Sequence, residues 1–177
     1  SLLRSDVQQR DLALEINEQA SELGMHVRRW GLAHTLTESA ESLDIMIGEK
    51  GYLRQFEKYS KPIMKAILSR GYQLNSDKVA ESKQRMDILV DVLNQRLIEN
   101  HGRYFVGERL GLADIAVCSM LAPLLEIAGT PWEKERGENL SDEFMQYKTF
   151  LTNLPLGQYV LRIYQTECTD RVDWRGV

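Results

Sequence analysis

Cysteine is scarce in this chain of 177 residues, and long apolar stretches are missing from it. The two cysteines, Cys118 and Cys168, stand far apart and form no Cys-x-x-Cys pair. Such usage is typical of a reducing compartment, so we expect a cytoplasmic protein with Cys118 buried and Cys168 the more accessible thiol. No apolar run reaches the ~18 residues that a membrane-spanning helix needs, and no secretory signal is visible. We therefore expect no membrane partner.

An excess of basic charge is also missing. The chain has 22 Lys and Arg against 26 Asp and Glu, which gives a formal net charge of −4. A net negative charge does not attract the phosphates of nucleic acids, so we expect no nucleic-acid partner. The composition, 43% hydrophobic and 27% charged, predicts one globular domain over residues 1–177 with a real core.

No segment shows the sustained period-2 alternation of a β-strand, whereas apolar residues recur at helical spacing along most of the chain. The sequence therefore predicts an all-α bundle of about six helices. Their expected extents are 5–35, 52–70, 75–100 and 112–127, with Asn75 or Ser76 as the cap of the third helix. One helix capped by Ser141 and one opened by Pro155 follow.

Several local features sharpen these expectations. Ser5 and Gln8 form a capping box at the first helix, and Gly24 and Gly31 predict a bend or break within it. Gly71 stands where a helix-ending glycine belongs. The second helix is expected to bury Phe56, Ile63, Ile67 and Leu68, and the fifth helix carries Phe144, Tyr147, Phe150 and Leu151.

The start of the fourth helix is the most informative stretch. With Gly111 as N-cap, Asp114 occupies the third helical position and can reach back to the amide of residue 111. Leu110 and Ile115 are placed to form a hydrophobic staple across the same turn. Because the helix that follows is apolar on nearly every side, we expect it at the centre of the bundle, where Asp114 must be hydrogen-bonded.

The sequence offers little for metal or hydrolytic chemistry. A helical di-metal site uses Glu-x-x-His motifs, but the residues three positions before His26, His34 and His101 are Leu23, Gly31 and Ile98. A Gly-x-Ser-x-Gly motif is absent as well. We expect no metal site and no serine hydrolase.

Four stretches together resemble the C-terminal helical domain of soluble glutathione S-transferases of the bacterial type. In FVGERLGLADIA, Gly107 matches the loop glycine of the family motif and Asp114 its aspartate, whereas Gly111 replaces the usual Ser or Thr. The other stretches are LLRSDVQQRDLALEINEQASELGMHVRRW, RGYQLNSDKVAESKQRMDILVDVLNQRL and PLGQYVLRIYQ. The resemblance covers most of the chain in a consistent order.

The resemblance carries functional expectations. It implies a parent enzyme that uses glutathione as cosubstrate and attacks a hydrophobic electrophile or a disulfide. The glutathione-activating residue of the family lies in an N-terminal thioredoxin-like domain, which we expect to be absent from this chain. We therefore expect no catalytic residue here, no glutathione bound by this chain alone, and a homodimer to which the domain contributes part of the interface.

In the family, the later part of the first long helix lines the pocket for the second substrate. That part carries His26, Arg28, Arg29 and Trp30 in this chain. By this resemblance, His26, Arg29 and Trp30 are candidates for binding the electrophile, with Arg29 holding an anionic group and Trp30 offering an apolar face. The same residues also fit a core tryptophan beside a solvated arginine pair and a surface histidine.

Two other interpretations stay open at this stage. The chain could be a non-catalytic binding or assembly module of the same fold, or an unrelated helical bundle. A thioredoxin-like segment upstream of it in the parent protein would favour the enzyme.

Overall fold

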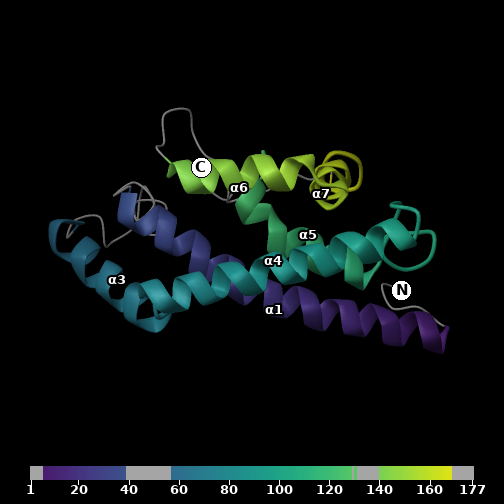
Figure 1. Cartoon of the computed structure of the whole chain (residues 1–177), viewed down its shortest axis with the longest axis horizontal. Coiled ribbons are helices and arrows are strands. Elements are labelled where there is room, and N and C mark those ends of the chain that lie inside the picture. The colour runs from purple at the N-terminus through teal and green to yellow at the C-terminus, as the bar shows by residue number, and fades with distance from the viewer. Residues whose placement is uncertain (1–5, 39–56, 129, 131–139, 169–177) are drawn as a thin grey trace.

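The structure, a computed structural model, describes residues 6–38, 57–128, 130 and 140–168. Helices joined by turns and loops make up these residues, with no strand among them, which confirms the all-α prediction (Figure 1). No helix within these ranges is both long and apolar enough to cross a membrane. The helices are α1 (Val7–Glu38), α3 (Glu57–Gly71), α4 (Ser76–Glu99), α5 (Leu112–Leu125), α6 (Asp142–Asn153) and α7 (Pro155–Thr166).

The short helix α5 is the centre of the bundle. It packs against α1, α6 and α7, while α1 also runs along α4, and α7 contacts α4 and α6. In Figure 1, α6 and α7 lie on one side of α5, and α1 and α4 lie on the other. One apolar core therefore joins helices from both ends of the chain.

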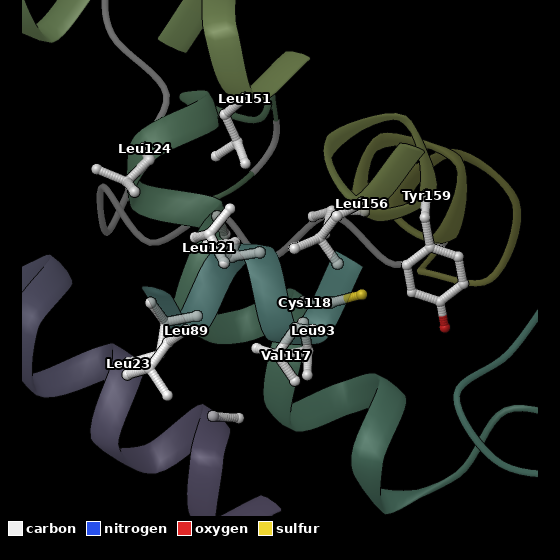
Figure 2. Packing of buried hydrophobic residues seen from close by; sticks show 14 of the residues in the cluster. Leu23, Leu89, Leu93, Val117, Cys118, Leu121, Leu124, Leu151, Leu156 and Tyr159 are labelled. Carbon is white, nitrogen blue, oxygen red and sulfur yellow. The ribbon is translucent and has the colours of Figure 1, made fainter. Parts of the chain in front are cut away.

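Figure 2 shows this core from close by. Five helices contribute side chains to it, and burial of these apolar surfaces is the main stabilising contribution to the fold. The fully buried members include Leu23 of α1, Leu93 of α4, Leu121 of α5, Leu151 of α6 and Leu156 of α7.

Helix α5 begins at Leu112 with Gly111 as N-cap, as the sequence predicted, and it ends at Leu125, two residues before the expected Ile127. Most of its residues are buried. Ile115, however, exposes 41% of its surface, so the predicted staple buries little apolar area at this position. The helix is therefore central but retains one solvent-facing edge.

Helix α1 differs from its prediction at both its start and its middle. It begins at Val7, and Asp6 caps it by accepting a hydrogen bond from the Gln9 amide at 2.9 Å, while the predicted cap Ser5 lies outside the described residues. The helix continues without a break through Gly24 and Gly31. Gly24 serves packing instead, because a Cβ there would lie 2.1 Å from the sulfur of Met120 on α5.

Helix α3 is the least embedded helix of the described chain. Ile63 and Ile67 expose 61% and 65% of their surfaces, so their predicted burial is wrong, and Phe56 lies outside the described residues. The predicted role of Gly71 is also wrong. Gly71 is the last helical residue, and Gln73 takes the left-handed conformation, φ 53°, that ends the helix. Apolar spacing thus predicts which side chains share one face of a helix, but it does not predict whether another helix covers that face.

Helices α4 and α6 start as the sequence predicted. Asn75 Oδ1 accepts a hydrogen bond from the Lys78 amide at 2.9 Å, and Ser141 Oγ accepts one from the Phe144 amide at 3.1 Å. Both side chains thereby satisfy an amide that has no partner within its helix. On α6, Phe144, Tyr147 and Leu151 are buried, whereas Phe150 exposes 48% of its surface.

Helix α7 begins at the predicted Pro155, but its capping group comes from elsewhere. Its N-cap residue, Leu154, has no side-chain acceptor. Buried Asn94 of α4 supplies one instead, because its Oδ1 accepts a hydrogen bond from the Leu156 amide at 3.0 Å. The next residue, Gly157, allows close contact with α6, since a Cβ there would lie 1.9 Å from the Leu151 carbonyl oxygen.

Candidate functional site

Asp114 is fully buried and holds the corner where the loop before α5 meets α7. Its Oδ2 accepts a hydrogen bond from the Gly111 amide at 2.8 Å, which is the interaction expected from the sequence. Its Oδ1 accepts from the Phe105 amide at 2.8 Å and from the Tyr159 hydroxyl at 2.5 Å. These three donors compensate the carboxylate for its loss of water, so the role of Asp114 and Gly111 is structural.

Tyr159 connects this corner to α7. Burial, the nearby charge of Asp114 and the hydrogen bond to Asp114 all raise the pKa of its phenol. The hydroxyl therefore keeps its proton and acts as a permanent donor. Its ring lies edge-on to Phe105 at 5.5 Å and carries the Arg162 guanidinium at 5.1 Å from its centroid.

The two cysteines lie as predicted. Cys118 is buried on α5, whereas Cys168 is exposed after α7, and both are free. Burial and the charge of Asp114 raise the pKa of the Cys118 thiol. Because the thiolate is the reactive form, Cys118 is inert in the folded chain.

The residues proposed to bind substrate lie together on the second half of α1, but they differ in accessibility. Arg28 is exposed, Arg29 is half-buried, and His26 and Trp30 are buried. Arg29 is therefore the most exposed member of the candidate trio, His26, Arg29 and Trp30.

Trp30 is packed inside the protein, with 1% of its surface exposed. Its ring stacks on Phe144 with centroids 5.6 Å apart and planes 11° apart, and it tilts against Tyr147 at 5.1 Å and His34 at 4.4 Å. These contacts attach α6 to α1. The face that a substrate would need is occupied by the protein's own aromatic side chains.

Arg29 is held by two hydrogen bonds. Its Nε donates to the Tyr72 carbonyl oxygen at 2.9 Å, and its Nη1 donates to Ser82 Oγ at 2.9 Å. Tyr72 belongs to the turn after α3, and Ser82 belongs to α4. A single guanidinium therefore joins three segments, while its Nη2 makes no hydrogen bond to the described residues.

His26 shares Ser82 with Arg29. The His26 Nδ1 lies 3.2 Å from Ser82 Oγ, and its Nε2 lies 3.8 Å from Glu22 Oε1. Because a guanidinium can only donate, Ser82 Oγ accepts from Arg29. The Ser82 hydroxyl proton is then available to be donated to His26 Nδ1. This arrangement fits a neutral His26 that carries its proton on Nε2, toward Glu22.

The electrostatic setting favours the neutral form of His26. Burial is the largest influence and lowers its pKa. The cations Arg29 and Arg85 lower this pKa further. Glu22 and Glu81 act in the opposite direction without cancelling the others.

Sequence analysis missed Ser82, and no local signal could have found it, because its partners lie 53 and 56 residues away. Ser82, His26 and Glu22 stand in the order of a nucleophile, a base and an acid. Ser82 is, however, completely buried, and its oxygen accepts a hydrogen bond from Arg29. The cluster can therefore hold and orient a guanidinium, but it does not present a nucleophile.

Within the described ranges, no group of three or more His, Cys, Asp or Glu side chains could hold a metal ion. The polar contacts on α1 accordingly concern hydrogen bonding and charge. What they offer a ligand is half-buried Arg29, whose Nη2 has no hydrogen-bond partner among the described residues and suits an anionic group.

Comparison with known protein families gives one match. The model of the family described as "Glutathione S-transferase, C-terminal domain" matches residues 59–154, from within α3 to the N-cap of α7. The searches of curated proteins and of solved structures found no match. The matched region is more than half of the chain, and it contains Asp114 with its amide donors at Phe105 and Gly111. The chain belongs to the family of glutathione S-transferase C-terminal domains.

Proposed function

We propose that this chain is the helical domain of a glutathione S-transferase-like enzyme and forms the wall that receives the electrophilic second substrate. Membership of the family is the observation that carries the proposal. In this scheme an N-terminal thioredoxin-like domain of the same protein binds glutathione, the cosubstrate, and lowers the pKa of its thiol. The thiolate then attacks the electrophile or disulfide held against the helical domain.

In the proposed site Arg29 makes the direct contact. Its partial exposure and open Nη2 suit an anionic group on the substrate. His26 and Ser82 lie behind Arg29 and orient it, and the packing of Trp30 against Phe144 keeps this part of α1 in place. We therefore propose that, of His26, Arg29 and Trp30, Arg29 contacts the substrate and the other two hold it in position.

We also propose a cytoplasmic homodimer, with a hydrophobic electrophile as the second substrate of the whole protein. Light scattering of the purified protein measures the oligomeric state. The competing function is a non-catalytic binding or assembly module of the same fold. Glutathione conjugation by the complete protein, monitored with a chromogenic aryl halide, supports the enzyme, whereas its absence supports the module.

The binding wall can be tested on this chain with 8-anilinonaphthalene-1-sulfonate, an aromatic anion whose fluorescence rises on binding. Arg29→Ala should weaken its binding about tenfold, because one charge-assisted hydrogen bond contributes ~1.5–3 kcal/mol. Arg28→Ala, which removes the exposed neighbouring guanidinium, is the matched control and should change binding less than about twofold. Equal effects of the two variants would place the anion site elsewhere.

Glutathione itself should not bind to this chain alone. Isothermal titration of the chain with millimolar glutathione should give no heat beyond dilution, because the family's glutathione site lies in the thioredoxin-like domain. A saturable heat would overturn this division between the domains.

A further inference from the structure

The turn between α3 and α4 depends on α1 for its position. Helix α3 is absent from the helix pairs that pack extensively in the described chain, and it projects at one edge of the bundle (Figure 1). Its exposed Ile63 and Ile67 show the same lack of packing. Contacts within the turn thus have a large share in fixing the direction of α3.

The turn is closed by its own hydrogen bonds and then attached by Arg29. The Leu74 amide donates to the Ser69 carbonyl at 2.9 Å, and the Gln73 amide donates to the Arg70 carbonyl at 3.2 Å. These bonds leave the Tyr72 carbonyl free to accept from Arg29 Nε at 2.9 Å. This last bond crosses from the turn to α1.

The position of Arg29 depends in turn on Ser82 and His26. Ser82 Oγ can accept from Arg29 Nη1 and donate to His26 Nδ1 only while Nδ1 carries no proton. Protonation makes Nδ1 a donor, so Ser82 faces two cationic donors and its own proton loses its acceptor. Because Ser82 is completely buried, water cannot replace His26 as the acceptor of that proton.

The charges around His26 oppose its protonation. Arg29 of α1 and Arg85 of α4 would then lie near a third positive charge. The carboxylates that face His26 are Glu22 of α1 and Glu81 of α4. Glu22 is already paired with Arg85, with Nε and Oε1 2.5 Å apart, and Glu81 with Lys78 at 2.7 Å, so neither is a free counter-ion.

We propose that His26, Ser82 and Arg29 form an acid-sensitive latch, which holds the α3–α4 turn on α1 and releases it when His26 binds a proton. The latch involves only residues of this chain and no substrate. Its failure and the failure of the proposed binding wall are therefore separate outcomes.

Hydrogen–deuterium exchange of the chain at pH 7.5, 6.5 and 5.5, with labelling times corrected for intrinsic exchange, tests the latch. Peptides that cover Gln73 and Leu74 should open more readily as the pH falls, by up to about tenfold per pH unit below the ordinary histidine pKa. Peptides of α5 should not follow. In His26→Gln, whose amide oxygen can still accept from Ser82, the pH dependence of the turn should disappear.

Matched variants keep the test decisive. His101→Asn removes an exposed imidazole from a left-handed position, φ 62°, that asparagine tolerates, and it should retain the full pH dependence. Arg29→Met cuts the tie to Tyr72, so its turn should exchange rapidly at every pH. The latch is overturned if the unmodified turn exchanges equally at the three pH values, if His26→Gln behaves like the parent, or if Arg29→Met leaves the turn protected.

Discussion

Two clusters of polar side chains lie inside this domain, and each must provide hydrogen-bond partners for groups removed from water. They do so in different ways. The Asp114 corner buries a carboxylate and gives it three donors, two of them backbone amides. The His26 cluster instead shares one hydroxyl between an imidazole and the guanidinium of half-buried Arg29. The first arrangement contains no histidine, whereas the second contains one whose pKa is lowered by burial. The comparison teaches that a buried carboxylate with three hydrogen-bond donors fixes the segments that donate to it. A hydroxyl shared by two side chains allows those side chains to rearrange.

The largest effect should come from the first cluster. Asp114→Ala leaves buried amides at Phe105 and Gly111 without acceptors, so we expect a loss of about 3 kcal/mol in the free energy of unfolding. Denaturant melts followed by circular dichroism measure it. Asp91→Ala, at an exposed position of α4, is the control and should change stability by less than about 0.5 kcal/mol. A midpoint of Asp114→Ala equal to that of the parent would remove the corner's structural role.

Breaking the second cluster should cost less. Ser82→Ala removes one hydroxyl from between Arg29 and His26, and Arg29 can turn partly toward water, so we expect a loss of about 1 kcal/mol. The control is Ser119→Ala, because Ser119 is exposed on α5 and bonds only to carbonyls of its own helix. If Ser82→Ala destabilises as much as Asp114→Ala, the two clusters are equally rigid and the comparison fails.

The smallest effect is the pH dependence carried by His26. Its folded pKa is lowered, so the unfolded chain binds the proton more readily and stability is lost as the pH falls through the ordinary histidine pKa of about 6.5. Between pH 7.5 and 6.5 the free energy of unfolding should fall by a few tenths of a kcal/mol more in the parent than in His26→Gln. Melts at the two pH values measure this difference. A steeper fall in His26→Gln would reverse the sign of the argument.

The sequence predicted the helices well because their signals are local. Side-chain caps at Asn75 and Ser141, and the Asp114–Gly111 pair, each join residues within one turn. Apolar periodicity then gave the fold class. At the start of α1, Asp6 likewise caps within one turn by accepting from the Gln9 amide.

The errors in predicted burial concern contacts that span the chain. The apolar spacing of Ile63 and Ile67 is correct for a helix face, but periodicity cannot say whether another helix covers that face. The candidate site shows the same limit. The family resemblance directed attention to Arg29, yet its partners Tyr72 and Ser82 are brought to it only by the packing of α1 on α4.

The amide of Asn94 gives α7 a starting signal that its own sequence lacks. Helix α7 is 12 residues long, and helices of that length are marginal by themselves. Its first turn is completed by a side chain 62 residues upstream. Helix α7 therefore depends on α4 for its start. As an isolated peptide it would lose its cap, and in another scaffold it would need a side-chain amide in the position of Asn94. The unit that evolution or an engineer can exchange is α7 together with the α4 position that caps it.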